Sequence, residues 1–168
     1  ALIELNLASN ALGRDARPLC VALCEYANGR ALKVLRLADN ALDLEAMEPV
    51  LRMVADNTRL KHLDLAWNLI DARAAEALAR ALEINTTLKR VNLAGNAVGR
   101  DGCYALARAL TDNTALAALD LSTNRIEEDQ HDPGEYLKPD GKVGYRYRTS
   151  HFSADSHCHA HGKIVLPP

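Results

Sequence analysis

The fold is decided by a nine-residue stretch, Leu60-Lys61-His62-Leu63-Asp64-Leu65-Ala66-Trp67-Asn68. Leu63 and Leu65 alternate with polar residues, which is the two-residue period of a strand that buries one face. The same period turns His62 and Asp64 to the opposite surface. The stretch therefore predicts a short strand with one apolar face, followed by a bend at asparagine.

The pattern Leu-x-x-Leu-x-Leu-x-x-Asn recurs along the chain. Its copies are Leu2-Leu5-Leu7-Asn10, Leu32-Leu35-Leu37-Asn40, Leu60-Leu63-Leu65-Asn68, Leu88-Val91-Leu93-Asn96 and Leu116-Leu119-Leu121-Asn124. After a first interval of 30 residues, the asparagines follow one another at intervals of 28. A fixed period of this length predicts a solenoid whose repeats stack on their neighbours.

The segment between successive copies has the period of a helix. Ala75, Leu78, Ala79 and Leu82 recur at three- and four-residue spacing, which places them on one helical face. With these helices, residues 1–126 resemble the leucine-rich repeat of the ribonuclease-inhibitor-like type. The resemblance implies an α/β solenoid, an open horseshoe with parallel strands on its concave face and helices on its convex face.

Asparagine recurs at two places in each repeat, and both predict a structural role. At the bend after the strand, a buried side-chain amide can satisfy backbone groups of the adjacent repeat. At the helix ends stand Asn57-Thr58, Asn85-Thr86 and Asn113-Thr114. We expect these asparagines to adopt the left-handed conformation of a C-terminal cap.

Two regions are expected. Residues 1–126 form five repeats, of which the last is truncated, and residues 127–168 form an irregular tail that contains Pro133, Pro139, Pro167 and Pro168. Aromatic residues predict the anchors of the tail: Tyr136, Tyr145, Tyr147 and Phe152. Because terminal repeats normally need caps, an uncapped first repeat indicates an excerpt of a longer protein.

Composition gives no reason to expect nucleic acid or a membrane as the partner. The formal net charge of -2 provides no basic footprint for nucleic acid or an anionic membrane, and no apolar run is long enough to span a bilayer. The spacing of Cys20, Cys24, Cys103 and Cys158 matches no disulfide framework, so we expect reduced thiols and an intracellular, cytoplasmic protein. Cys20 and Cys24 share a helical face and are interpreted as core residues, although they could also supply half of a zinc site.

We expect the chain to have no metal site and no catalytic site. The stretch His157-Cys158-His159-Ala160-His161 lacks the second ligand pair of a structural zinc site, so we predict neither a metal nor another cofactor. The sequence contains no nucleophile elbow, phosphate loop or metalloprotease motif, and we expect no enzyme. One alternative rests on resemblance alone: the activator of the small GTPase Ran has similar repeats and an acidic tail, which Glu127 to Asp132 resembles faintly.

The expected function is therefore protein binding by the concave face. Outward-facing strand positions and the position just before each asparagine supply the predicted binding residues: Trp67, Arg36, Asp39, His62, Asp64, Arg90 and Asn92. Trp67 is the only tryptophan, and tryptophan and arginine are enriched where binding energy concentrates. Its ring could equally serve to cover the neighbouring repeat. The resemblance implies a scaffold or regulatory module, including a structural subunit of a larger cytoskeletal or ciliary assembly.

Overall fold

Each repeat builds a short strand that is followed by a helix. In the computed structural model, which describes residues 2–25, 31–56, 59–124, 126, 157–158 and 163–165, the repeat strands are β1 (Glu4–Asn6), β2 (Val34–Arg36), β3 (His62–Asp64), β4 (Arg90–Asn92) and β5 (Ala118–Asp120). The helices are α1 (Ala16–Glu25), which follows a 3-10 turn η1 (Gly13–Asp15), then α2 (Leu44–Ala55), α3 (Ala72–Ile84) and α4 (Gly99–Asp112). The predicted alternation of strand and helix is confirmed.

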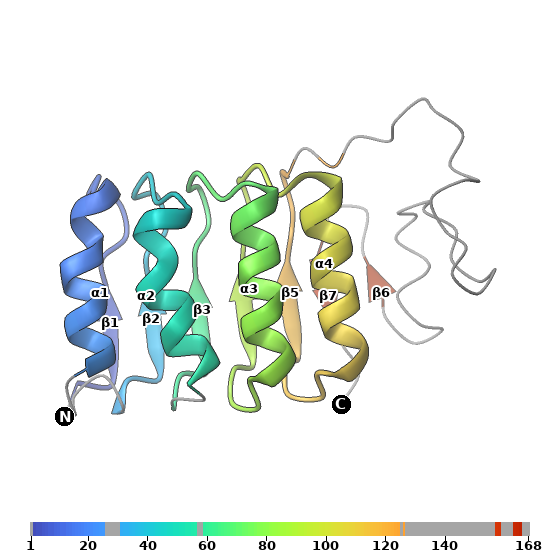
Figure 1. The fold of residues 1–168 in the computed structure, drawn as a ribbon, viewed down its shortest axis with the longest axis horizontal. Helices are drawn as coiled ribbons and strands as arrows, with labels where there is room; N and C mark the ends of the chain where they lie inside the picture. Colours follow the sequence, from blue (N-terminus) through green and yellow to red (C-terminus); the bar gives the residue numbers. More distant parts are fainter. Residues whose placement is uncertain are drawn as a thin grey trace.

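The five repeat strands form one parallel sheet in chain order, with Leu5, Leu35, Leu63, Val91 and Leu119 aligned across it. The four helices stand side by side on one face of that sheet (Figure 1). None of the described helices lies on the other face, which we call the open face. Two layers with parallel strands are the expected α/β solenoid.

The core is a single seam between the sheet and the helices. Leu35, Leu37, Leu63 and Leu65 are buried on the strand side, and alanine, valine, leucine and methionine side chains meet them from the helices. Small side chains let neighbouring helices approach closely. A Cβ added at Gly102 of α4 would lie 2.8 Å from the Cβ of Ala75 on α3, so this helix contact requires glycine.

The asparagine at each bend joins its repeat to the one before. Asn68 is buried, and its amide nitrogen donates to the carbonyl oxygens of Leu37, Leu65 and Ala66 at 3.0 to 3.1 Å. Its side-chain oxygen accepts the backbone N–H groups of Asn40 and Leu42. The equivalent bonds recur from Asn40, Asn96 and Asn124. The structural role predicted for these residues is confirmed.

The asparagines at the helix ends form a second series of bonds, and their predicted conformation was wrong. Asn85 and Asn113 have φ of -78° and -80° with extended ψ, not left-handed values. The amide nitrogen of Asn113 donates to Leu82 O at 2.6 Å and to Asn85 O at 3.0 Å. Their side-chain oxygens accept backbone N–H groups two and three residues later, so these asparagines join the turn after each helix to the preceding repeat. Asn57 and Thr58 lie outside the described residues.

The segment after the repeats adds two short strands to the sheet. Strand β7 (Lys163–Val165) pairs antiparallel with β5, and β6 (His157–Cys158) pairs antiparallel with β7. These five residues differ from the irregular tail that we expected. The predicted anchors Tyr136, Tyr145, Tyr147 and Phe152 lie outside the described residues, so their role stays a prediction.

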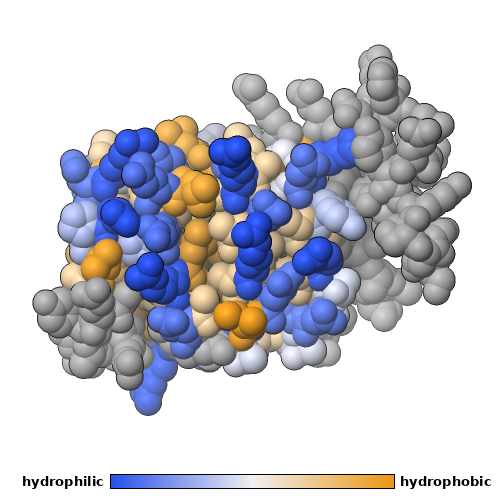
Figure 2. Space-filling model, viewed as in Figure 1, coloured by the Kyte–Doolittle hydropathy of each residue, from blue (hydrophilic) through white to orange (hydrophobic). Residues whose placement is uncertain are grey.

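The helical face is polar and its charges pair with one another. Figure 2 shows hydrophilic side chains spread over this face, with hydrophobic ones between them. Ion pairs bridge neighbouring helices, as Arg17 on α1 does with Glu48 on α2 and Arg108 on α4 does with Glu83 on α3. Such exposed pairs each contribute at most about 1 kcal/mol. None of the described helices is both long and apolar enough to cross a membrane.

Candidate functional site

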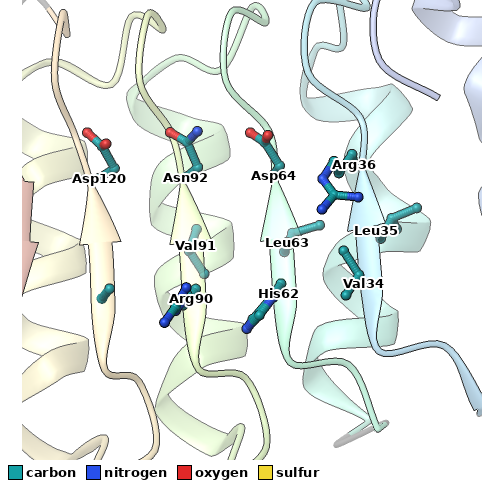
Figure 3. Close-up of a pocket in the computed structure, with 11 residues that line it drawn as sticks. Val34, Leu35, Arg36, His62, Leu63, Asp64, Arg90, Val91, Asn92 and Asp120 are labelled. Carbon is teal, nitrogen blue, oxygen red and sulfur yellow. The ribbon is translucent and has the colours of Figure 1, made fainter. Parts of the chain in front are cut away.

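The open face presents two rows of side chains, because the first and third residues of each three-residue strand point away from the helices. The row at the amino ends of the strands consists of Glu4, Val34, His62, Arg90 and Ala118. The row at the carboxyl ends consists of Asn6, Arg36, Asp64, Asn92 and Asp120. Figure 3 shows both rows standing out from the sheet, with His62 beside Arg90 in one and Asp64, Asn92 and Asp120 aligned in the other.

Between the rows lies a shallow groove of about 230 Å³, which passes over the middle strand residues Leu35, Leu63 and Val91. Their side chains are buried in the core on the helix side, so strand backbone forms the floor. Residues from β2, β3, β4 and β5 form its walls. The groove brings together five of the predicted binding residues: Arg36, His62, Asp64, Arg90 and Asn92. The other two, Trp67 and Asp39, lie beyond the carboxyl ends of their strands and outside the groove.

Most of the carboxyl-end row is bonded to its own backbone. The side-chain oxygen of Asp64 accepts the N–H of Ala66 at 3.2 Å, two residues later, and Asn92 accepts that of Ala94 at 3.0 Å. Asn6 and Asp120 make the same bond. These Asx turns end the strand and start the bend. Asp64 and Asn92 therefore have a structural role that the sequence analysis did not assign to them.

Arg36 is the exception in this row, since a guanidinium has no acceptor for an Asx turn. Its side chain instead forms an ion pair with Glu4 of the preceding repeat, across both rows of the open face. Both partners remain substantially exposed. The pair joins the first two repeats and places a cation in the groove.

The position before each bend asparagine is left-handed in every repeat. Ser9, Asp39, Trp67, Gly95 and Thr123 have φ between 54° and 70°. A left-handed tryptophan would be an outlier if it occurred alone. Here the same conformation recurs at every turn, so it belongs to the repeat geometry, and it directs the next residue, asparagine, into the core.

Trp67 combines both interpretations that the sequence left open. Its indole covers Gly95 of the next repeat so closely that a Cβ at Gly95 would collide with the ring. The residue nevertheless keeps 58% of its surface exposed, and Leu69 two residues later keeps 60%. The ring is thus held in place by its neighbour while much of it remains available to a partner.

The amino ends of the strands carry cations that the sequence analysis missed. Lys33, Lys61 and Lys89 each directly precede the amino-end row. They are adjacent, because the N–H of Lys61 donates to Lys33 O and that of Lys89 to Lys61 O, both at 2.8 Å. The signal was present in the sequence, since lysine follows the first leucine of the pattern in three successive repeats.

A second hollow, of about 460 Å³, lies on the helical face between α3 and α4. It is larger than the groove, but several of its charged residues already pair, as Arg80 does with Glu76 and Arg108 with Glu83. Such pairs leave less charge for a ligand than the open face offers. We therefore regard the groove between the strand rows as the better candidate site.

The described residues contain no group of three or more His, Cys, Asp or Glu side chains placed to hold a metal ion. His159 and His161 lie outside those residues, so the histidine-rich stretch is not tested. Cys20 and Cys103 are buried in the core, as their apolar sequence neighbours predict.

Comparison with known proteins agrees with this architecture. The family model described as "Leucine Rich repeat" matches residues 56–79 and 85–107, which together include β3, part of α3, β4 and part of α4. The chain carries leucine-rich repeats. They are of the ribonuclease-inhibitor-like type, and the parallel strands extend the same arrangement through all five repeats.

Two solved structures share the repeat fold. The structure of leiomodin-1 actin-binding site 2 has a TM-score of 0.63 and 23% sequence identity, over 69% of this chain and 68% of that one. The tropomodulin C-terminal domain from Caenorhabditis elegans has a TM-score of 0.64 and 16% identity, over 72% of this chain and 74% of that one. At this level of identity the similarity establishes the fold. No curated protein sequence matches the chain.

Proposed function

We propose that the chain is a protein-binding module of the cytoskeleton and that its open face contacts the partner. The observation that carries the proposal is the groove, in which partly exposed polar and charged side chains from four neighbouring strands surround a shallow hollow. Interfaces combine apolar contacts with a polar surround, and the exposed Trp67 and Leu69, beyond the carboxyl end of β3, supply the apolar surface here. A sheet face free of helices also offers a broad and rigid surface.

Trp67 is the expected energetic centre. An aromatic ring that is fixed by Gly95 loses little side-chain entropy when a partner covers its exposed part. Arg36 and Arg90 lie one repeat to either side, at the groove. Tryptophan and arginine are the residues in which interface energy concentrates most often. Asp39, His62, Asp64 and Asn92 complete the proposed contact surface.

Actin is the first partner to test, because one of the similar solved structures is named as an actin-binding site. A cytoskeletal module would be found in the cytoplasm, where the thiols of this chain stay reduced. Membership in a larger assembly, cytoskeletal or ciliary, remains part of this proposal.

The test is binding of the purified chain to monomeric actin by fluorescence anisotropy and to filaments by co-sedimentation. We expect Trp67→Ala to weaken binding by roughly 2 kcal/mol, about thirtyfold, with an unchanged circular dichroism spectrum. Arg36→Ala should cost less and depend on salt. Tyr104→Ala is the control, since it removes an exposed aromatic ring from the helical face.

Two results would count against the proposal. If Tyr104→Ala weakens binding and Trp67→Ala does not, the helical face is the interface. If neither form of actin binds, the cytoskeletal assignment loses its principal candidate. The alternative of activating Ran has no observation in its favour, because Glu127 to Asp132 lie outside the described residues.

A further inference from the structure

A row of cations lies at the amino ends of the central strands, and none of its members forms an ion pair among the described residues. It consists of Lys33, Lys61, His62, Lys89 and Arg90, which we call the basic row. Lys33, Lys89 and Arg90 are exposed, and Lys61 and His62 are half-buried. None of the five appears in the salt bridges of the described residues, whereas most arginines on the helical face do.

The backbone fixes the spacing of this row. Lys33, Lys61 and Lys89 occupy equivalent positions on hydrogen-bonded neighbours, and His62 is in register with Arg90. Adjacent strands lie about 4.8 Å apart, so the three lysines span about 10 Å at the Cα atoms. Carboxylates on alternate residues of an extended peptide are about 7 Å apart and can meet such a row with two or three side chains.

Nearby carboxylates do not neutralise the row. Asp56 and Asp112 end α2 and α4 at this edge of the sheet, but in the described residues neither forms an ion pair with a member of the row. Glu4 is paired with Arg36, and Glu83 with Arg108. Among the described residues, one lysine side chain of the row forms a hydrogen bond, from Lys61 Nζ to Thr87 O at 3.1 Å. Positive charge is therefore concentrated here in a chain whose net charge is -2.

We propose that the basic row binds an acidic, extended peptide segment of the partner. This inference rests on the proposed function, because it assigns a chemistry to one end of the same open face. Charge complementarity carries it: cations in line attract a line of carboxylates and set its orientation across the strands. Nucleic acid also carries spaced anions, but the row is short and the chain as a whole has a net charge of -2, which favours a short acidic segment of a protein over a long polyanion.

The experiment measures binding of a fluorescein-labelled oligoglutamate peptide to the full chain by anisotropy, at low ionic strength and at about 0.15 M salt. We expect saturable binding that weakens with salt. The variant Lys33→Gln, Lys89→Gln, Arg90→Gln should lose about tenfold or more in affinity. Lys61 is left in place because of its bond to Thr87.

The matched control is Arg52→Gln, Arg73→Gln, Arg80→Gln, which removes the same charge from exposed positions of the helical face. It should bind the peptide as the unmodified chain does. Equal losses in both triple variants would mean that only net charge matters and would overturn the proposal.

Two further outcomes would overturn it. One is a single-stranded oligonucleotide that binds more tightly than oligoglutamate through the same residues. The other is a basic-row variant that unfolds more easily yet binds the peptide normally, which would mean that the lysines only offset the helix C-termini. The actin assay separates this inference from the proposed function: if Trp67 is needed for actin while oligoglutamate does not bind, only the acidic segment is disproved.

Discussion

The two ends of the same strands use their polar residues differently. At the carboxyl ends, Asp64, Asn92 and Asp120 each accept a backbone N–H two residues later, and the bend asparagines that follow are bonded to the preceding repeat. At the amino ends, the basic row makes no ion pair among the described residues. A polar residue that recurs in a repeat is thus not necessarily a binding residue, and its bonding partners decide between the two roles.

The largest effect should come from the bend asparagines. Asn68→Ala would leave the backbone groups of Asn40, Leu42 and Leu37 without their side-chain partner inside the protein. We expect the free energy of unfolding, measured by urea denaturation, to fall by about 3 to 5 kcal/mol. Each buried backbone group that is left without a hydrogen-bond partner costs about 1 to 3 kcal/mol.

Asn10→Ala provides the matched control, because the exposed Asn10 side chain donates to Leu7 O and Ala8 O of its own repeat and to no other repeat among the described residues. Its cost should stay near 1 kcal/mol. Equal losses from Asn10 and Asn68 would break the comparison, since burial between repeats would then contribute nothing.

A smaller loss is expected from the Asx turns. Asp64→Ala removes the acceptor for the N–H of Ala66 and should cost about 1 kcal/mol of stability, while Asp64→Asn keeps an acceptor and should be nearly neutral. Thermal unfolding of the two variants measures the difference. If Asp64→Ala were neutral in stability but weakened partner binding, Asp64 would belong with the amino-end residues.

The carboxylate of Asp43, at the start of α2, makes the stability of the fold depend on pH. Asp43 accepts the N–H of Ala46 at 2.9 Å, and this hydrogen bond, assisted by Arg14, lowers the pKa of the carboxyl below its ordinary value of 3.8. The folded state therefore gains stability from the ionised form above about pH 4, and loses it as the pH falls through the lowered pKa.

Asp43→Asn keeps an acceptor at the helix start but does not titrate. We expect the unmodified chain to lose stability relative to this variant when denaturation is compared at about pH 5 and about pH 3. The difference should stay below about 1 kcal/mol, since the carboxyl is partly exposed. Parallel pH profiles for the two proteins would contradict the assignment.

The smallest change in stability is expected at the amino ends. Arg90→Gln removes an exposed side chain without a described ion pair and should alter the free energy of unfolding by no more than about 0.5 kcal/mol. Urea denaturation measures it. A loss of 1 kcal/mol or more would show that the amino-end residues contribute as much to stability as the Asx turns at the carboxyl ends do.

The sequence predicted the features that recur with the repeat period. Leu63, Leu65 and Asn68 could be placed correctly because their spacing repeats, and a repeat fixes both the buried face and the bend. The conformation of Asn85 could not, since the choice between a left-handed cap and a bond to the preceding repeat depends on how closely the helices stack. Strand β7 was missed because three residues are too short to show a period.

The candidate site was predicted in part, for a related reason. Alternation correctly turned His62 and Arg90 outward, yet it could not distinguish them from Asp64, whose oxygen is already bonded. The lysines were overlooked because they fall between the first leucine and the strand, where alternation assigns no face. Trp67 needed the contact with Gly95 to show that its ring is both fixed and exposed.

The antiparallel pairing of β7 with β5 has a consequence for polymerisation. Copies of a parallel array can stack head to tail when the last strand of one copy meets the first strand of the next, and a contact of that kind generates open filaments. Here Lys163–Val165 occupies the free edge of β5 with reversed polarity. The outermost described strand on that side is β6, which has only two residues, so an incoming β1 would meet a short edge strand there in place of β5.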